Sequence, residues 1–124
     1  MDELRRIAEQ IGGIDDPAAL LAGLFRHAPV AFVIYRASGE CVLVNDAFRG
    51  LFGGALPDGY NIFDGESTSE RTFSEHIRRA AAGETVHVPA YWYKPTVLPE
   101  IERQIALEVT LFPLLDRARA ITHV

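Results

Sequence analysis

The chain has 124 residues, with 12 Lys and Arg against 17 Asp and Glu, for a formal net charge of −5. This length fits one domain, and the acidic balance argues against nucleic acid or anionic lipid as a partner, since their binders carry basic surfaces. Cys41 is the only cysteine, which excludes an internal disulfide and a cysteine-based metal site. No apolar run is long enough to be a secretory signal or a membrane span, so we expect a cytoplasmic protein with no membrane contact.

Residues 2–11 are predicted to form an amphipathic helix that Gly12-Gly13 ends. Its narrow apolar stripe consists of Leu4, Ile7, Ala8 and Ile11. A helix this short is marginal by itself, so we expect the stripe to pack on its own domain or on a second copy of the chain. These four residues are therefore the predicted interface of a homodimer. Residues 1–16 are treated as a helix and linker, and residues 17–124 as the domain.

A second helix is predicted directly after the linker. Asp16 is placed to cap it, and Pro17 occupies its first position, where a missing N–H costs nothing. Pro29 follows its end. Its apolar face consists of Leu20, Leu21, Leu24 and Phe25.

A β-hairpin comes next, followed by a short helix. Residues 30–36 are rich in β-branched and aromatic side chains, which predicts a strand. A turn at Ser38-Gly39 leads to a returning strand at residues 41–44. Asn45 can cap the helix that begins at Asp46. The apolar face of this helix consists of Ala47, Phe48, Leu51 and Phe52, and Gly53-Gly54 ends it.

A loop and a longer helix occupy the middle of the chain. Residues 55–67 predict a loop with one helical turn near Ile62-Phe63. Ser67 and Glu70 have the spacing of a capping box, so they predict the start of the longer helix. Gly83 ends it. Its apolar residues are Phe73, Ile77, Ala80 and Ala81.

The remaining elements are strands. Residues 85–93 alternate between apolar and polar side chains, but Pro89 cannot donate to a ladder, which predicts a sheet edge or a bulge there. Residues 103–112 predict a regular strand, and a turn at 116–119 precedes a last strand at 121–124. Because helices and strands do not alternate one by one, the order predicts an α+β fold with a largely antiparallel sheet.

This order of elements resembles the PAS domain family over residues 20–124. No single mark is specific, but their joint order is characteristic. The marks are Pro29 before the first strand, Ser38-Gly39, Val44-Asn45-Asp46-Ala47-Phe48, Leu51-Phe52-Gly53, Ala82-Gly83-Glu84 and Phe112-Pro113-Leu114-Leu115-Asp116. Two departures stand out: the turn at 116–119 lacks the usual Gly, and the last strand is short. We therefore expect one domain excised from the start of a longer protein, with Met1 as its native N-terminus.

The resemblance implies a five-stranded antiparallel sheet in the order 2-1-5-4-3, with helices on one face and the third strand at an edge. It implies a sensory module of a signal-transduction protein such as a sensor histidine kinase, with a C-terminal output domain in the same full-length chain. It also implies structural roles for Gly39, Asn45, Gly83 and Pro113.

The family's ligand site is an apolar cavity between helices and sheet. The residues of this sequence that would line it are Val33, Tyr35, Val44, Phe48, Phe52, Ile62, Phe63, His76, Ile77, Leu107 and Val109. Such walls would suit a small apolar ligand. The alternative is that the same side chains simply fill the core.

The resemblance argues against the family's best-known cofactors, so the cofactor is left unassigned. The flavin photosensors of the family carry an Asn-Cys-Arg helix motif, whereas Cys41 lies on a strand, where it is expected to be a small buried hydrophobe. The family's haem ligand is a His on the long helix, and His76 lies about one turn later than that position. His27, His87 and His123 have no partner at metal-ligand spacing, so no metal is expected.

No catalytic motif is present, so we expect this domain not to be an enzyme. The rival enzymatic interpretation is a small cone-shaped α+β isomerase or hydratase, which needs a buried Asp or Glu base. Glu108 is the acid within a predicted strand, and the alternation turns it away from the apolar face. A further alternative is a pure protein–protein interaction module. The run Tyr91-Trp92-Tyr93 fits either ordinary packing or an exposed contact patch.

Overall fold

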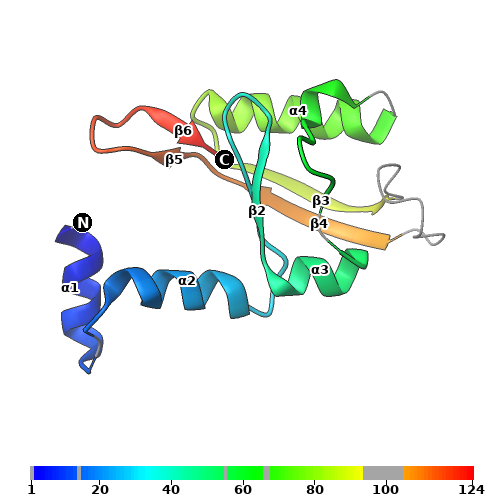
Figure 1. Ribbon diagram of the computed structural model, residues 1–124. Helices are drawn as coiled ribbons and strands as arrows, with labels where there is room; N and C mark the ends of the chain where they lie inside the picture. Colours follow the sequence, from blue (N-terminus) through cyan, green and yellow to red (C-terminus); the bar gives the residue numbers. More distant parts are fainter. Residues whose placement is uncertain (1, 14, 55, 66–67, 94–104) are drawn as a thin grey trace.

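The computed structural model describes residues 2–13, 15–54, 56–65, 68–93 and 105–124 (Figure 1). Its mixture of helices and antiparallel strand pairs confirms the predicted α+β class. None of the helices in these residues is long and apolar enough to cross a membrane. The elements are α1 (Asp2–Ile11), α2 (Pro17–His27), β1 (Val33–Tyr35), β2 (Cys41–Val44), α3 (Asp46–Phe52), the 3-10 helix η1 (Ile62–Asp64), α4 (Thr68–Ala81), β3 (Val86–Tyr93), β4 (Ile105–Leu111), β5 (Leu114–Leu115) and β6 (Ile121–His123).

The predicted caps set the helix boundaries. The Asp16 carboxylate accepts hydrogen bonds from the Ala18 and Ala19 amides at 3.1 and 3.2 Å, which fixes the start of α2. Asn45 caps α3 in the same way, and Gly53 ends α3 in the left-handed region at φ 75°. The capping box proposed for α4 involves Ser67, which lies outside the described residues.

The hairpin pairs Val33 of β1 with Val44 of β2. β1 is shorter than the predicted span of 30–36 because the Asn45 side chain forms hydrogen bonds with backbone groups of the residues that precede β1. The Asn45 Oδ1 atom accepts from the Phe32 amide at 2.9 Å, and Nδ2 donates to the Val30 carbonyl at 2.8 Å. These groups are therefore satisfied without a strand ladder.

The pair β3–β4 is antiparallel, and its register shifts between Val88 and Tyr91, at Pro89. This confirms the predicted irregularity. The strand predicted at 103–112 is observed as β4, which ends at Leu111; residues 103 and 104 lie outside the described residues. The short strand β5, which begins at Leu114, was not predicted from the sequence. Pro113 explains the break between β4 and β5, because proline has no N–H for the ladder and restricts the residue before it.

The strands form three two-stranded sheets, β1–β2, β3–β4 and β5–β6. The single sheet in the order 2-1-5-4-3 that the resemblance implied is not what the described residues show, and that order stays a prediction. Two of the pairs are nevertheless joined. Tyr35 and Val124 exchange two backbone hydrogen bonds of 2.8 Å, and the Ala37 amide donates to the Thr122 carbonyl at 3.0 Å.

The core consists of two clusters between the strands and helices α3 and α4. In the first, Ile77 and Ala80 of α4 are completely buried. The second is built on Val44, Phe48 and Phe52, and the two phenyl rings lie 4.5 Å apart. Each cluster ties a helix to strands, as a two-layer α+β domain requires.

Helices α1 and α2 project from this body (Figure 1). No residue of α2 is buried, and Leu21 and Leu24 are 57% and 61% exposed. Ile7 and Ile11 of α1 are also exposed. The side chains of Leu4 and Ala8 lie outside the described part of the chain. Among the described side chains of these two faces, Ile7, Ile11, Leu21 and Leu24 are thus uncovered within one copy, while Leu20 and Phe25 are half-buried.

Candidate functional site

The predicted pocket residues, His76 apart, are divided between the two core clusters. The first cluster holds Tyr35, Ile62, Phe63, Ile77 and Val109, and the second holds Val44, Phe48, Phe52 and Leu107. Val33 packs against both. The structure thus brings these side chains together as packed core. Binding of a small molecule among them stays a prediction.

His76 lies on α4 and is half-buried. Its Nδ1 atom is buried and has no hydrogen-bond partner among the described residues. In the same part of the chain, no three His, Cys, Asp or Glu side chains gather closely enough to hold a metal ion. His76 is therefore a solitary imidazole at the edge of the core.

The histidines on strands and at the helix end make pairwise contacts at the surface. His87 Nε2 lies 3.2 Å from the carboxylate of Glu108, whose side chain is 63% exposed, in keeping with its predicted outward direction. His27 Nδ1 lies 3.6 Å from the Asp46 carboxylate. On the same β3–β4 pair, Tyr91 is half-buried and Trp92 is 69% exposed. The aromatic run thus has one packed and one exposed member; the Tyr93 side chain lies outside the described residues.

Burial changes the ionisation of two side chains near the core. It raises the pKa of the Cys41 thiol and of the Tyr91 hydroxyl, because the charged form of each would lose hydration. Cys41 packs against both core clusters. A thiol in this environment is a packing group and a poor nucleophile.

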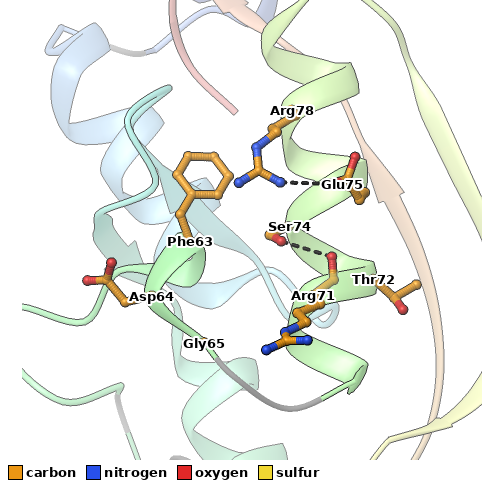
Figure 2. Close-up of a pocket in the computed structure, with 8 residues that line it drawn as sticks. All are labelled: Phe63, Asp64, Gly65, Arg71, Thr72, Ser74, Glu75 and Arg78. Carbon is orange, nitrogen blue, oxygen red and sulfur yellow. Dashed lines mark hydrogen bonds and ion pairs between the residues drawn. The ribbon is translucent and has the colours of Figure 1, made fainter.

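A groove that the sequence did not predict lies between η1 and α4 (Figure 2). Its volume is about 520 Å³, within the range of small-molecule sites. Phe63 is its one member from the predicted pocket. The lining residues are Phe63, Asp64, Gly65, Arg71, Thr72, Ser74, Glu75 and Arg78.

The η1 wall of the groove is held in place by the first hairpin. The Phe63 amide donates to the Asn61 side-chain oxygen at 2.9 Å, and Asn61 Nδ2 donates to the Ser38 carbonyl at 3.1 Å. Gly39 has φ +98°, and a Cβ there would lie 2.8 Å from Cε2 of the Phe63 ring. Only glycine allows this close approach.

The end of η1 meets α4 at a second glycine. A Cβ on Gly65 would lie 2.6 Å from the Cβ of Glu70. Glu70 is buried, and its carboxylate lies 3.4 Å from the Tyr60 hydroxyl, close enough for a long hydrogen bond. The sequence marked Glu70 as a capping residue, and nothing in the pattern announced its burial. The contact at Gly39 thus packs η1 on the first hairpin, and the contact at Gly65 packs the end of η1 on α4.

The α4 wall carries the charge. The Arg78 guanidinium lies 4.6 Å from the centroid of the Phe63 ring and forms a 2.8 Å ion pair with Glu75. Arg71 forms no ion pair with any described residue, although its carbonyl accepts a 2.9 Å hydrogen bond from the Ser74 hydroxyl. The sequence signal for this wall, exposed charges at i, i+4 and i+7, is the same as for an ordinary solvated helix face.

No family model matches the chain, and no curated protein matches it either. Solved structures do. A domain of a sensory box sensor histidine kinase/response regulator from Geobacter sulfurreducens superposes with a TM-score of 0.60 at 16% identity, covering 86% of this chain and 90% of that one. The PAS domain of BvgS from Bordetella pertussis gives a TM-score of 0.63 at 18% identity, covering 88% and 82%. At such identities the similarity establishes the fold, and the chain has the fold of a PAS domain.

Proposed function

We propose that the chain is a non-catalytic sensory and dimerisation module of a larger signal-transduction protein of the sensor histidine kinase type. The observation that carries this proposal is the shared fold, which covers more than four-fifths of this chain and of each sensor-protein domain it matches. Because one fold can carry several functions, the proposal also rests on features of this chain itself. These features are the exposed helices α1 and α2, the two core clusters and the strand β1.

The exposed apolar faces of α1 and α2 support a homodimer. Leu21 and Leu24 belong to a helix with no buried residue, and uncovered apolar surface of this kind marks interaction sites. A second copy related by a two-fold axis would cover equivalent faces on both chains. Ile7 and Ile11 of α1 would belong to the same interface.

Sedimentation velocity of the full chain and of a chain lacking residues 1–14 tests the dimer. We expect the full chain to be dimeric at tens of micromolar and the shortened chain to dissociate more readily, because it lacks the α1 stripe. Circular dichroism controls for loss of the fold. Two monomeric samples at that concentration would exclude the dimer.

The central strand β1 offers a path from the core to an output domain that would follow the chain's C-terminus. Tyr35 is buried in the first cluster, and its backbone exchanges both hydrogen bonds with Val124. A change in core packing that moves Tyr35 would therefore move the end of β6. A ligand among the core residues can bias two packings only through different affinities for them.

Native mass spectrometry of the purified chain addresses the ligand. A bound small molecule with a fixed mass would support sensing through the core pocket. A ligand-free dimer would favour the alternative of a pure interaction module. The isomerase alternative calls for a buried base, and the strand acid Glu108 is exposed while Glu70 is hydrogen-bonded to Tyr60.

The cytoplasm is the proposed location. A chain with one half-buried cysteine is compatible with a reducing compartment, where disulfides are rare. Fractionation of cells that express the full-length protein with a tag on this domain, combined with protease protection, would test it.

A further inference from the structure

The groove between η1 and α4 is separate from the predicted core pocket. Arg71, Thr72, Glu75 and Arg78 lie on the exposed side of α4, whereas Ile77 and Ala80 on its other side are fully buried. The proposed dimer does not involve the groove, and Phe63 is the one residue that the groove shares with the predicted core pocket. Its chemistry can therefore be considered independently of the proposed sensory function.

The groove carries an excess of positive charge on its α4 wall. Arg78 is balanced by Glu75, while Arg71 has no ion-pair partner among the described residues. Figure 2 shows both guanidinium groups extending from α4 towards the η1 side, and the Asp64 carboxylate pointing away from α4. The planar Arg71 guanidinium can pair with a carboxylate in a bidentate geometry.

The groove also offers a flat surface. The Arg78 guanidinium already lies over the Phe63 ring, and the opposite face of a stacked guanidinium can take a second planar group. Arg71 and Arg78 are seven residues apart, which is two helical turns or about 10 Å along α4. A compact ligand with a charged head and a flat body spans such a distance.

The geometry points to a binding site for a small planar carboxylate, an aromatic organic acid, in this groove. The carboxylate pairs with Arg71, and the ring stacks against Arg78 on its Phe63 support. Gly39 lets the first hairpin pack closely on Phe63, and Gly65 lets the end of η1 lie against Glu70 of α4, so these close contacts reduce the ordering needed on binding. The site is open to solvent, so we expect weak affinity, with a Kd of the order of 1 mM for a ligand as small as benzoate.

The test is a titration of the ¹⁵N-labelled chain with benzoate, in which the amide chemical shifts are measured at each benzoate concentration. Saturable shifts are expected at η1 and along the Arg71–Arg78 turns of α4. Benzamide keeps the ring without the charge, and acetate keeps the charge without the ring. Each is expected to bind about fivefold more weakly than benzoate, because each lacks one of the two interactions.

Three variants assign the roles. Arg71→Gln should raise the benzoate Kd about fivefold, whereas the matched control Arg79→Gln should change it by less than about twofold. Arg79 lies on the same helix, exposed and paired with Glu84, and is not part of the groove. Glu75→Gln should tighten binding about twofold, because it frees Arg78 from its competing ion pair. A purely structural role for Glu75 would give no tightening.

Four results would overturn the site. They are the absence of saturable shifts up to about 20 mM benzoate, equal binding of benzoate and benzamide, equal effects of Arg71→Gln and Arg79→Gln, and shifts confined to core amides such as Val33 and Val44. The last result would instead place the ligand in the predicted core pocket. Sedimentation does not depend on this groove, and the amide shifts distinguish a ligand in the groove from one in the core, so the two proposals can fail separately.

Discussion

Asn45 connects three backbone groups from two segments. It is 1% exposed; its Oδ1 accepts from the amides of Phe48 and Phe32, and its Nδ2 donates to the Val30 carbonyl. The cap accounts for one of these bonds. The other two hold the residues before β1 against the start of α3, so the side chain is a junction between hairpin and helix.

Asn45→Ala should therefore cost more than the roughly 1 kcal/mol of a simple cap. We expect about 2–3 kcal/mol, because the Phe32 amide and the Val30 carbonyl lose partners in a partly buried site. Chemical denaturation measures the loss. Asn45→Asp, which keeps the accepting oxygen and loses the donor to Val30, should fall between the wild type and Asn45→Ala. A loss of 1 kcal/mol or less for Asn45→Ala would show that water replaces the two additional bonds.

Because of Cys41, the free energy of unfolding is expected to decrease at high pH. Burial raises the pKa of its thiol above the ordinary value of 9.0, so the folded chain holds the proton more tightly than the unfolded chain. The contribution of the Cys41 thiol to the free energy of unfolding is complete below the pKa that the thiol has in the unfolded chain. It is lost as the pH rises through the pKa of the thiol in the folded chain. The free energy of unfolding of the wild type should thus fall above about pH 9, and that of Cys41→Ala should fall less steeply. Parallel pH curves for the two proteins would contradict this.

The elements that could be predicted from the sequence are those with local start and stop signals. Asp16, Asn45 and Gly53 act through neighbouring residues, and the bounds of α2 and α3 follow from them. β1 was predicted too long and β5 was not predicted, because distant or conformational effects decide them: Asn45 bonds the groups before β1, and Pro113 separates β5 from β4. A linear pattern of apolar residues contains neither effect.

The candidate site also has one part that could be predicted from the sequence and one part that could not. The apolar residues predicted to line a pocket do converge, because burial follows from apolar periodicity. The groove could not be foreseen, since charges on an exposed helix face look alike whether or not another element lies beside them. It exists because Gly39 and Gly65 let η1 approach its neighbours, and these contacts are between residues distant in the sequence or across a loop.

Helix α2 exposes two leucines that the proposed dimer would cover. Leu21→Gln and Leu24→Gln should change the stability of the monomer by less than about 0.5 kcal/mol, because both side chains are exposed. The buried Phe48→Ala should cost about 3–5 kcal/mol. The proposed dimer should weaken about a hundredfold in each leucine variant, since burial of a leucine at an interface is worth about 1.5 kcal/mol or more and a two-fold dimer contains the side chain twice. Denaturation at low concentration and sedimentation measure the two effects; leucine variants that lose monomer stability and leave the dimer intact would mean that α2 is covered within its own chain.

At the scale of the whole molecule, packing contacts and backbone hydrogen bonds connect the core to the C-terminal end of the chain. Val44 lies in the second cluster opposite Val33 of β1, and Val33 contacts the first cluster as well. Tyr35 at the end of β1 bonds Val124. Under the proposed sensory function, a disturbance at Val44 would reach the chain's end through this one short strand. Closely packed interiors transmit such strain because they have little free volume.

Val44→Phe and Val109→Phe should therefore mimic or block ligand occupancy in the full-length protein. Each adds volume to a packed site, which costs about 1–3 kcal/mol and favours whichever packing leaves more room. The matched control is Leu43→Phe, next to Val44 on β2 but 50% exposed. We expect the two core variants to keep their circular dichroism spectrum and to shift the signalling output of the proposed full-length sensor, up or down, while Leu43→Phe leaves it unchanged. If output is the same in all three variants with the fold intact, the core does not communicate with the C-terminal strand, and the domain acts through its surfaces alone.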